Sequence, residues 1–352
     1  MKILIVGEWK YPMYEQAFAK ALESHGVKVL KFDTSVFFSG YFGWFMIRFP
    51  PLGTLLTALN SSLINEAEES RPDWVLFWRC THIIPSTLKY LKKIGIKLVS
   101  YNHDDPFNKN TGLNMLSTNR FLWFWYRKGI PLYDRNFFVR TVNCEEALKM
   151  GACSVDIMRQ YFVPWLHIPI ALTQEEKKRY QCDVVFVGHY ESDGREHSVR
   201  ALVDAGIHLK IWGGHYWSRE VLGDLYDRLQ PIAPAEGDDY AKVLCGAKIC
   251  LAFLSKMNRD TFTTRCAEIP ACSRVMLAER TEDLLRLFKE DEEACFFSSN
   301  KELVEKTRWL LENPDIRDRI AAAGLKRVWA DGHDVTSRAR SFLTVIDSKG
   351  II

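Results

Sequence analysis

The chain alternates short apolar runs with amphipathic stretches, first over residues 1–142 and again over residues 183–278. Apolar runs of strand length separated by stretches of helical periodicity indicate parallel β-strands joined by crossover helices. In the first half we expect strands at Lys2–Gly7, Val27–Phe32, Trp74–Arg79, Lys97–Tyr101 and Asn136–Val142, and helices over 14–25, 55–69 and 85–93.

The pattern restarts after residue 182 and ends in helices. We expect strands at Asp183–Gly188, His208–Gly213, Lys248–Leu254 and Arg274–Ala278, and helices at Arg195–Ala205, Tyr216–Leu229 and Tyr240–Cys245. Thr281, followed by two acidic residues, is a typical helix start, because an oxygen cap and negative charge suit the positive end of a helix. Further helices are expected around Leu303–Leu311, from Pro314 onward, and at Val335–Ile346.

A boundary separates the two halves. Pro164 and Pro169 precede the charged run Glu175–Arg179, which we interpret as a linker. At 352 residues the chain is long enough for two domains. We therefore expect one domain at 1–170, a second at 171–330, and a helical tail at 331–352.

Composition excludes several classes of protein. The chain is 47% hydrophobic and 26% charged with a net charge of +3, and it lacks the charged tail of a nucleic-acid-binding protein. Its nine cysteines form no Cys-x-x-Cys pair and have no histidine at zinc spacing, which favours a reducing, cytoplasmic setting. The apolar run at the amino terminus is too short for a signal peptide, and no apolar run reaches the roughly 18 residues of a membrane span.

Two segments are dense in aromatic residues and end in basic ones. They are Val36–Leu52, which contains Phe42, Trp44 and Phe45, and Phe121–Ile130. Aromatic and cationic side chains together suit a membrane interface, which would place the protein at the inner face of the membrane. The alternative is that these rings fill the core between helices and sheet.

The segment Asn258–Cys272 carries the strongest candidate chemistry, because it leads from one buried strand toward a helix and the next strand. Ligands of open α/β sheets bind at that edge. Thr263 or Thr264 can cap a helix whose free N–H groups favour a diphosphate. Arg265 can add a charge-assisted contact to phosphate, and Glu268, one turn later, can accept hydrogen bonds from a ribose. Alternatively, Arg265 and Glu268 form a surface ion pair.

Two other strand ends carry candidate residues. Gly188 permits close approach of a backbone to a ligand, with His189 beside it and Arg195 at the next helix start as a second phosphate ligand. In the first half, the strand at 97–101 leads into His103, Asp104 and Asp105. Those polar groups can face a ligand, or an aspartate can simply cap the turn before proline.

Several motifs are absent. No Asp-x-Asp occurs, so we expect neither a divalent metal on the diphosphate nor any bound cofactor, and arginine must neutralise the leaving group. Neither Gly7 nor Gly188 begins a Gly-x-Gly-x-x-Gly fingerprint, and no Gly-x-Ser-x-Gly elbow or Walker A loop is present.

Asp260 and Glu268 are eight residues apart, a spacing that resembles the Glu-x7-Glu motif of retaining GT-B glycosyltransferases, although Asp260 is one methylene shorter. Residues 258–271, 275–280, 303–311 and 319–328 resemble more specifically the CgeB-like, spore-protein-related glycosyltransferases. The resemblance implies two Rossmann-like domains facing a cleft, the GT-B fold, with the final helix packing back toward the first domain. It also implies that Glu268 holds the ribose, Arg265 a phosphate and Asp260 the hydroxyls of the donor sugar.

The same resemblance implies an acceptor-side role for His103, Asp104 or Asp105, either binding hydroxyls or accepting the proton. We therefore expect a hexosyltransferase-like enzyme that moves sugar from a nucleotide-diphosphate sugar to a glycan or lipid-linked acceptor, with retention of configuration. The two aromatic segments favour cell-surface polysaccharide assembly as its setting. A sugar-nucleotide epimerase of the same architecture and a non-catalytic binding or coat-associated protein are the two alternatives.

Overall fold

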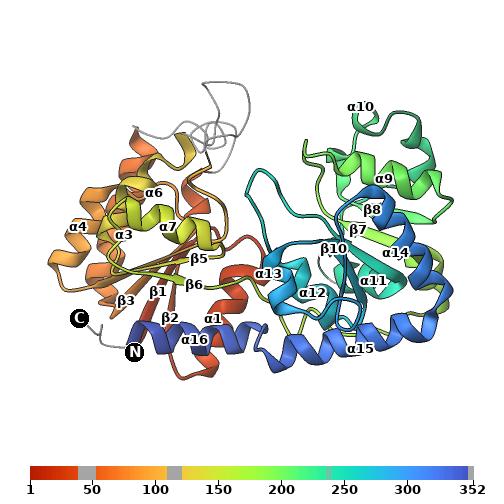
Figure 1. Ribbon diagram of the computed structural model, residues 1–352. Coiled ribbons are helices and arrows are strands. Elements are labelled where there is room, and N and C mark those ends of the chain that lie inside the picture. Colours follow the sequence, from red (N-terminus) through yellow and green to blue (C-terminus); the bar gives the residue numbers. More distant parts are fainter. Residues whose placement is uncertain (39–52, 109–120, 236, 238, 348–352) are drawn as a thin grey trace. The chain divides into compact units, whose positions relative to one another are not determined.

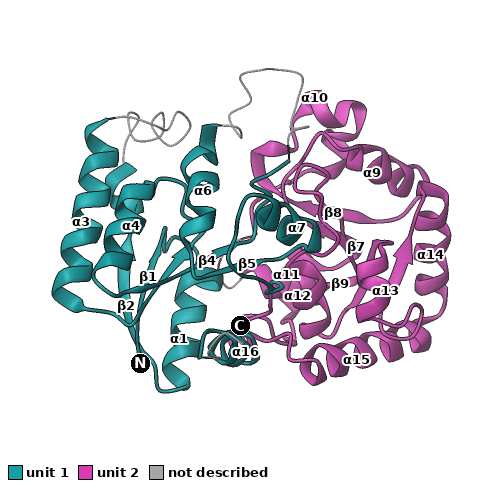
Figure 2. Ribbon diagram, turned by 60° about the vertical axis from the view of Figure 1, so that its left-hand side comes forward, with its two compact units in different colours: residues 1–160, 335–352 teal, residues 161–334 magenta. Residues whose placement is uncertain are grey.

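The computed structural model describes residues 1–38, 53–108, 121–235, 237 and 239–347, and the chain divides into two compact units. Unit 1 comprises residues 1–160 and 335–352, and unit 2 comprises residues 161–334 (Figure 2). Each unit is an α/β body with its own sheet and core (Figure 1).

Unit 1 is built on a six-stranded parallel sheet in the order β2-β1-β3-β4-β5-β6. Its strands are β1 (Lys2–Gly7), β2 (Lys28–Asp33), β3 (Trp74–Trp78), β4 (Lys97–Asn102), β5 (Arg135–Phe138) and β6 (Val155–Ile157). Helices cover both faces, so the central strands are buried throughout, as the unbroken apolar runs at 3–6 and 74–78 require.

The helical segments of unit 1 connect these strands and close the chain. They are η1 (Pro12–Gln16), α1 (Ala17–Ser24), η2 (Ser35–Phe38), α3 (Thr54–Ser70), α4 (Pro85–Lys93), α6 (Phe124–Gly129), η3 (Ile130–Leu132), α7 (Thr141–Lys149) and α16 (Val335–Asp347). The last of these packs on α1, where the ring of Phe342 lies 5.4 Å from that of Phe18 and His25 Nε2 lies 3.0 Å from the Thr336 carbonyl oxygen. The final helix therefore belongs to the core of unit 1.

Unit 2 holds a five-stranded parallel sheet in the order β11-β10-β9-β7-β8. Its strands are β7 (Cys182–Val187), β8 (Leu209–Trp212), β9 (Ala247–Ala252), β10 (Val275–Glu279) and β11 (Cys295–Phe297). Its helical segments are α8 (Gln174–Tyr180), α9 (Arg195–Asp204), η4 (Gly214–Tyr216), α10 (Arg219–Leu222), η5 (Gly223–Leu225), η6 (Asp227–Leu229), α11 (Asp239–Gly246), α12 (Arg265–Ala271), α13 (Glu282–Leu287), α14 (Asn300–Glu312) and α15 (Pro314–Ala330).

The linker interpretation of Glu175–Arg179 is wrong, because these residues lie in helix α8. Thr173 and Glu176 form a reciprocal capping box, in which each side chain accepts a hydrogen bond from the other residue's backbone N–H. Acidic residues in the first turn and basic residues in the last complement the helix dipole, and Tyr180 anchors the end in the core. The division between units falls after Gln160 and not near residue 170.

Two other expected elements differ from the structure. The expected helix at Tyr216–Leu229 is broken into short turns, and Gly223, with φ at 59°, interrupts it in the left-handed region. The expected strand Asn136–Val142 ends at Phe138, because Thr141 already begins α7. The predicted fold class of two parallel-sheet Rossmann-like domains with a helical tail is confirmed.

The aromatic segment at 121–130 contributes to the core of unit 1. Trp123, Tyr126 and Ile130 are buried against the helices and sheet of that unit. Phe42, Trp44 and Phe45 lie outside the described residues. Among the residues with described placement, no helix combines the length and apolarity that a membrane crossing needs.

Candidate active site

In unit 2, the sheet reverses its strand order between β7 and β9, and predicted site residues meet there. Arg265, the first residue of α12, donates from Nε to the carbonyl oxygen of Val187 at the end of β7. A Cβ on Gly188 would lie 2.8 Å from the Phe186 ring and 3.3 Å from Arg265 Nη2. The missing side chain at 188 thus leaves room for the guanidinium, so Gly188 and Arg265 are brought together.

Glu268 lies one turn along α12 and is only 3% exposed. Tyr240 Oη donates to its Oε2 at 2.5 Å, and His167 Nε2 lies 3.5 Å from its Oε1. Glu268 therefore contacts Tyr240 and His167, and not Arg265 as the ion-pair alternative requires.

The protonation of these two partners follows from burial and hydrogen bonding. The Val163 backbone N–H donates to His167 Nδ1 at 2.9 Å, which assigns the ring proton to Nε2, facing Glu268. Burial lowers the pKa of His167, against the opposing effect of Glu268, and burial raises the pKa of Tyr240 well above its ordinary value. At neutral pH both neighbours of Glu268 are thus neutral: Tyr240 donates a hydrogen bond to it, and His167 faces it with Nε2.

The loop after β7 is organised by Arg195. Its Nε and Nη2 bind the two carboxylate oxygens of Asp193 at 2.8 and 2.6 Å, and its Nη1 donates to the His189 carbonyl oxygen at 2.6 Å. Glu191 on the same loop accepts from Ser255 Oγ at 2.5 Å and so connects it to the loop after β9. The guanidinium of Arg195 thus binds protein groups and holds the loop in shape. The His189 ring is exposed, and its centroid lies 4.3 Å from that of the Tyr216 ring.

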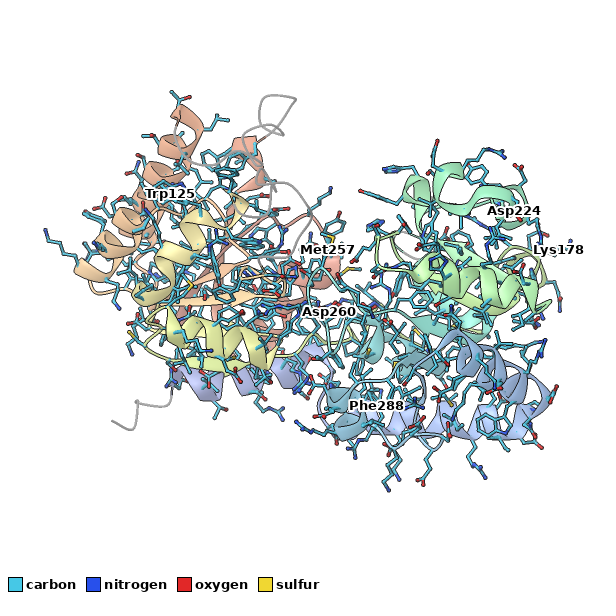
Figure 3. The ribbon with its side chains drawn as sticks, turned by 45° about the horizontal axis from the view of Figure 1, so that its top comes forward. Trp125, Lys178, Asp224, Met257, Asp260 and Phe288 are labelled. Carbon is cyan, nitrogen blue, oxygen red and sulfur yellow. The ribbon has the colours of Figure 1, made fainter. Side chains whose placement is uncertain are left out.

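The expected threonine cap of α12 is wrong. Thr264 at the N-cap position already has helical angles, with φ at −50° and ψ at −38°, and its side chain makes no cap hydrogen bond. The backbone carbonyl groups of Thr263 and Thr264 instead accept from the first turn. Asp260 lies on the loop before this helix (Figure 3). Its backbone N–H donates to the Ser255 carbonyl oxygen at 2.9 Å.

In unit 1, the strand order reverses between β1 and β3, and charged residues follow those strands. Arg79 adopts φ at 51°, and its Nε forms an ion pair with Asp104 after β4. Its Nη1 lies 3.4 Å from Glu8 after β1. Burial acts to raise the pKa of Asp104, but the charges of Arg79 and His103 outweigh it and hold that pKa well below the usual range.

His103 and Asp105 differ from Asp104 in their surroundings. Among the described atoms, His103 Nδ1 is buried without a hydrogen-bond partner, and the ring stacks 5.0 Å from that of Tyr14. Burial lowers the pKa of His103 to about 4. Asp105 is 1% exposed and accepts from the backbone N–H groups of Phe107 and Asn108 at 3.0 and 3.1 Å and from Asn143 Nδ2 at 2.9 Å. Asp105 therefore caps the turn that contains Pro106, whereas the alternative considered for these aspartates placed the capped turn before the proline.

A cavity of about 210 Å³ opens in unit 1 at the carboxyl ends of β1, β2 and β3. Its polar lining combines acidic, basic and hydroxyl side chains: Glu8, Lys10, Thr34, Ser35, Arg79, Thr81 and His82. The sequence did not single out these residues, apart from their place after predicted strands. Their variety suits a ligand rich in hydroxyl groups.

The lowered pKa of His103 predicts a pH dependence of stability. A folded pKa of about 4, below the ordinary 6.5, contributes stability that is present above pH 6.5 and is lost as the pH falls toward 4. When the pH is lowered from 7 to 4.5, the free energy of unfolding should fall in both proteins. In urea titrations the fall should be about 2 kcal/mol smaller for His103→Gln than for wild type. The exposed His215→Gln serves as the control and should follow wild type. Equal acid sensitivity of His103→Gln and wild type would contradict the assignment.

Comparison with known proteins places these features in context. A family model described as "Glycosyl transferase-like" matches residues 195–344. No curated protein matches this sequence significantly. Within the described part of the chain, no group of three or more His, Cys, Asp or Glu residues is arranged to hold a metal ion.

Solved structures of low sequence identity share the fold along nearly the whole chain. Anabaena HepE in complex with UDP and glucose is 12% identical with a TM-score of 0.68, covering 99% of this chain and 100% of that one. Sucrose-phosphate synthase from Thermosynechococcus elongatus is 12% identical with a TM-score of 0.69 and 98% coverage of both chains. A putative UDP-N-acetylglucosamine 2-epimerase from Listeria monocytogenes is 14% identical with a TM-score of 0.58, covering 99% of this chain and 95% of that one. The chain has the GT-B fold.

Proposed function

We propose that the protein is a glycosyltransferase that binds a nucleotide-diphosphate sugar in unit 2 and transfers the sugar to an acceptor bound by unit 1. The observation that carries this proposal is the placement of Arg265 beside Gly188 and of Glu268 one turn later, at the strand-order reversal of unit 2. The match to a glycosyltransferase-like family model over residues 195–344 supports it, as does the fold shared with HepE, whose structures contain UDP and UDP-glucose.

In this proposal Arg265 binds the diphosphate, and Glu268 binds the ribose. A carboxylate offers about four acceptor positions, and Tyr240 and His167 occupy only part of that capacity, which leaves positions for the two ribose hydroxyls. Asp260, on the loop before α12, is assigned to the hydroxyls of the donor sugar. Positive charge from Arg265 then stabilises the departing diphosphate without a metal ion.

On the acceptor side we assign Asp104 to binding hydroxyl groups. Its depressed pKa makes it a weak base at neutral pH, and the same is true of His103, with a pKa of about 4. An ionised carboxylate oriented by Arg79 is instead a strong hydrogen-bond acceptor. The acceptor we propose is a glycan or lipid-linked glycan of the cell surface, reached from the cytoplasmic side of the membrane.

A screen of nucleotide sugars tests the proposal. Thermal unfolding is followed with UDP-, GDP-, TDP- and ADP-sugars on wild type and on Glu268→Gln. At about 100 times its dissociation constant, a bound donor adds about 2.7 kcal/mol of stability to wild type, whereas Glu268→Gln should respond weakly. The proposal fails if no donor stabilises the wild-type protein.

Glu302→Gln is the matched control for this screen. It removes a helix carboxylate that pairs with Arg280 on the same unit, so it should lower the unliganded melting temperature while preserving the shift caused by the donor. If a donor raises the melting temperature of Glu268→Gln as much as that of this control, Glu268 does not bind the donor.

An epimerase is the second candidate, because the Listeria structure that shares the fold is a putative UDP-N-acetylglucosamine 2-epimerase. An epimerase converts the nucleotide sugar without an acceptor and leaves the diphosphate attached. NMR spectra of the donor incubated with protein alone distinguish the two: a new sugar epimer identifies the epimerase, and an unchanged donor favours the transferase.

A further inference from the structure

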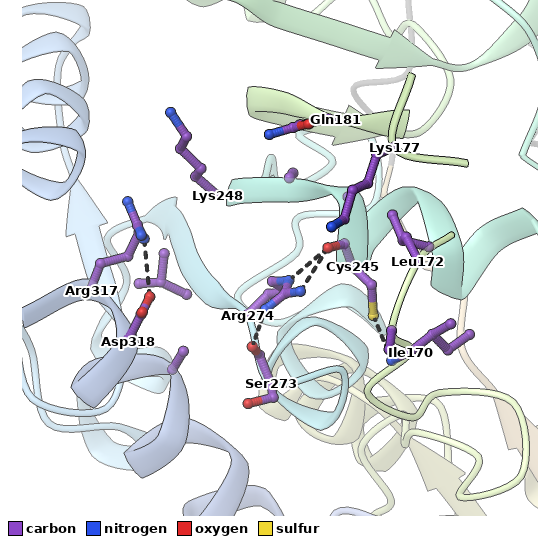
Figure 4. A pocket seen from close by; sticks show the side chains of 15 residues that line it. Ile170, Leu172, Lys177, Gln181, Cys245, Lys248, Ser273, Arg274, Arg317 and Asp318 are labelled. Atoms are coloured by element: carbon purple, nitrogen blue, oxygen red, sulfur yellow. Dashed lines mark hydrogen bonds and ion pairs between the residues drawn. The ribbon is translucent and has the colours of Figure 1, made fainter. Parts of the chain in front are cut away.

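A second cavity, of about 420 Å³, lies in unit 2 at the amino ends of β9 and β10, the sheet edge opposite to Gly188 and Arg265 (Figure 4). Its charged lining is mainly cationic, with Asp318 as the carboxylate among the described lining residues; the basic members are Lys177, Lys248, Arg274 and Arg317. Such a surface attracts anions and stabilises negative charge on a lining group.

Cys245, near the end of α11, is the cysteine among the described residues that line this cavity. The Ile170 backbone N–H donates to its Sγ at 3.3 Å, and in Figure 4 the sulfur points toward Ile170. Arg274 Nη2 donates to the Cys245 carbonyl oxygen at 2.7 Å, which keeps its guanidinium charge beside this residue.

Cys272 lies against Cys245 from the neighbouring helix. It follows the last residue of α12 and is fully buried, and the Cys245 thiol donates to its backbone carbonyl oxygen at 3.8 Å. The neighbouring Cys272 side chain, the Ile170 N–H and the charge of Arg274 lower the pKa of Cys245 despite its burial. Burial raises the thiol pKa of other cysteines in this unit: Cys182, Cys250, Cys266 and Cys295.

We propose that Cys245 and Cys272 form a reversible redox pair, in which a hydroperoxide entering the cationic cavity oxidises Cys245 and Cys272 then closes a disulfide. In the first step the Cys245 thiolate attacks one oxygen of hydrogen peroxide, the O–O bond breaks, and the sulfenic acid and hydroxide form; the hydroxide takes up the proton that Cys245 had released and leaves as water. In the second, the Cys272 sulfur attacks the Cys245 sulfur, the S–O bond breaks, and hydroxide leaves with the Cys272 proton as water. Two thiols and one hydrogen peroxide thus give one disulfide and two waters.

The two helices joined by this pair also carry the proposed donor site. Tyr240 of α11 bonds Glu268 of α12 at 2.5 Å, so a bond between Cys245 and Cys272 would connect the same helices at a second point. A disulfide holds its two sulfurs about 2 Å apart and so constrains the two helices relative to each other. If the proposed function holds, oxidation therefore weakens donor binding by about tenfold, roughly 1.4 kcal/mol.

Peptide mapping tests the pair without any nucleotide. Wild-type protein is treated with hydrogen peroxide, alkylated, and digested with trypsin without reduction. We expect peptide 243–248, which contains Cys245, to be joined to peptide 266–274, which contains Cys272, and dithiothreitol to separate them. Because Cys266 lies in the second peptide, Cys266→Ser is the matched control and should retain the cross-link.

Two variants resolve the order of the steps. Cys272→Ser, or Cys272→Ala if the serine variant does not fold, should stop at a Cys245 sulfenic acid that dimedone traps, and Cys245→Ser should give neither product. The proposal is overturned if wild type forms no cross-link between these peptides, if Cys266→Ser abolishes the cross-link, or if the Cys272 variants form no sulfenic acid at Cys245. Because the readout is mass, a failure to bind nucleotide would not affect this test.

Discussion

Arg265→Ala is expected to weaken binding of a nucleoside diphosphate by about 10- to 100-fold, because charge-assisted hydrogen bonds contribute about 1.5–3 kcal/mol. Arg265 is placed beside Gly188 by its bond to the Val187 carbonyl oxygen, and the missing side chain at 188 leaves room for its guanidinium. Lysine retains the charge but not the planar fork, so Arg265→Lys should recover only part of the affinity.

The comparison between ligands makes this prediction specific to the diphosphate. Arg265→Ala should bind the free nucleoside as wild type does, and should lose only the affinity that the diphosphate adds. Arg200→Ala is the matched control, because it removes an exposed arginine of α9 that pairs with Asp224. It should leave the affinities for nucleoside and nucleoside diphosphate unchanged. An equal loss for nucleoside and nucleoside diphosphate would show that the substitution damages the fold rather than a phosphate contact.

The second large effect is expected at Asp104. Asp104→Asn leaves Arg79 without its principal counter-ion in a partly buried site, which should cost unit 1 about 1–3 kcal/mol of stability in urea titrations. If Asp104 binds acceptor hydroxyls, the transfer rate should also fall by about 100-fold or more, while donor affinity stays at the wild-type value.

Lys92→Met provides the control for that substitution, because it removes the more exposed ion pair with Asp134 in the same unit. Its effect on stability should stay within about 1 kcal/mol, and transfer should be unaffected. If Asp104→Asn transfers sugar at the wild-type rate, the role of Asp104 is purely structural.

The sequence predicted the repeated strand and helix order because buried parallel strands appear as uninterrupted apolar runs. That order already places Gly188, Arg265 and Asp104 after strand ends, which is where the structure has them. Helix α8 was missed because its signal is a capping box around a charged helix with a single buried tyrosine, and a charged run alone resembles a linker.

The sequence could not predict the residues that only tertiary packing places beside the candidate site. His167 comes from an irregular segment and Tyr240 from a separate helix, and neither belongs to a motif that would connect it with Glu268. Likewise, only the structure shows that Asp105 bonds a turn while Asp104 pairs with Arg79, since the two adjacent aspartates are equivalent in sequence.

The central claim is that Arg265 and Glu268 form a nucleotide-sugar site, and calorimetric titration tests it most directly. Wild type, Arg265→Ala and Glu268→Gln are each titrated with UDP, GDP, TDP and ADP, and with the 2′-deoxy form of whichever binds. We predict one site per chain in wild type, about 10-fold or greater weakening in each variant, and sensitivity to the missing 2′-hydroxyl in wild type but not in Glu268→Gln. Absence of binding by all four nucleotides, or equal affinity in wild type and both variants, would contradict the claim.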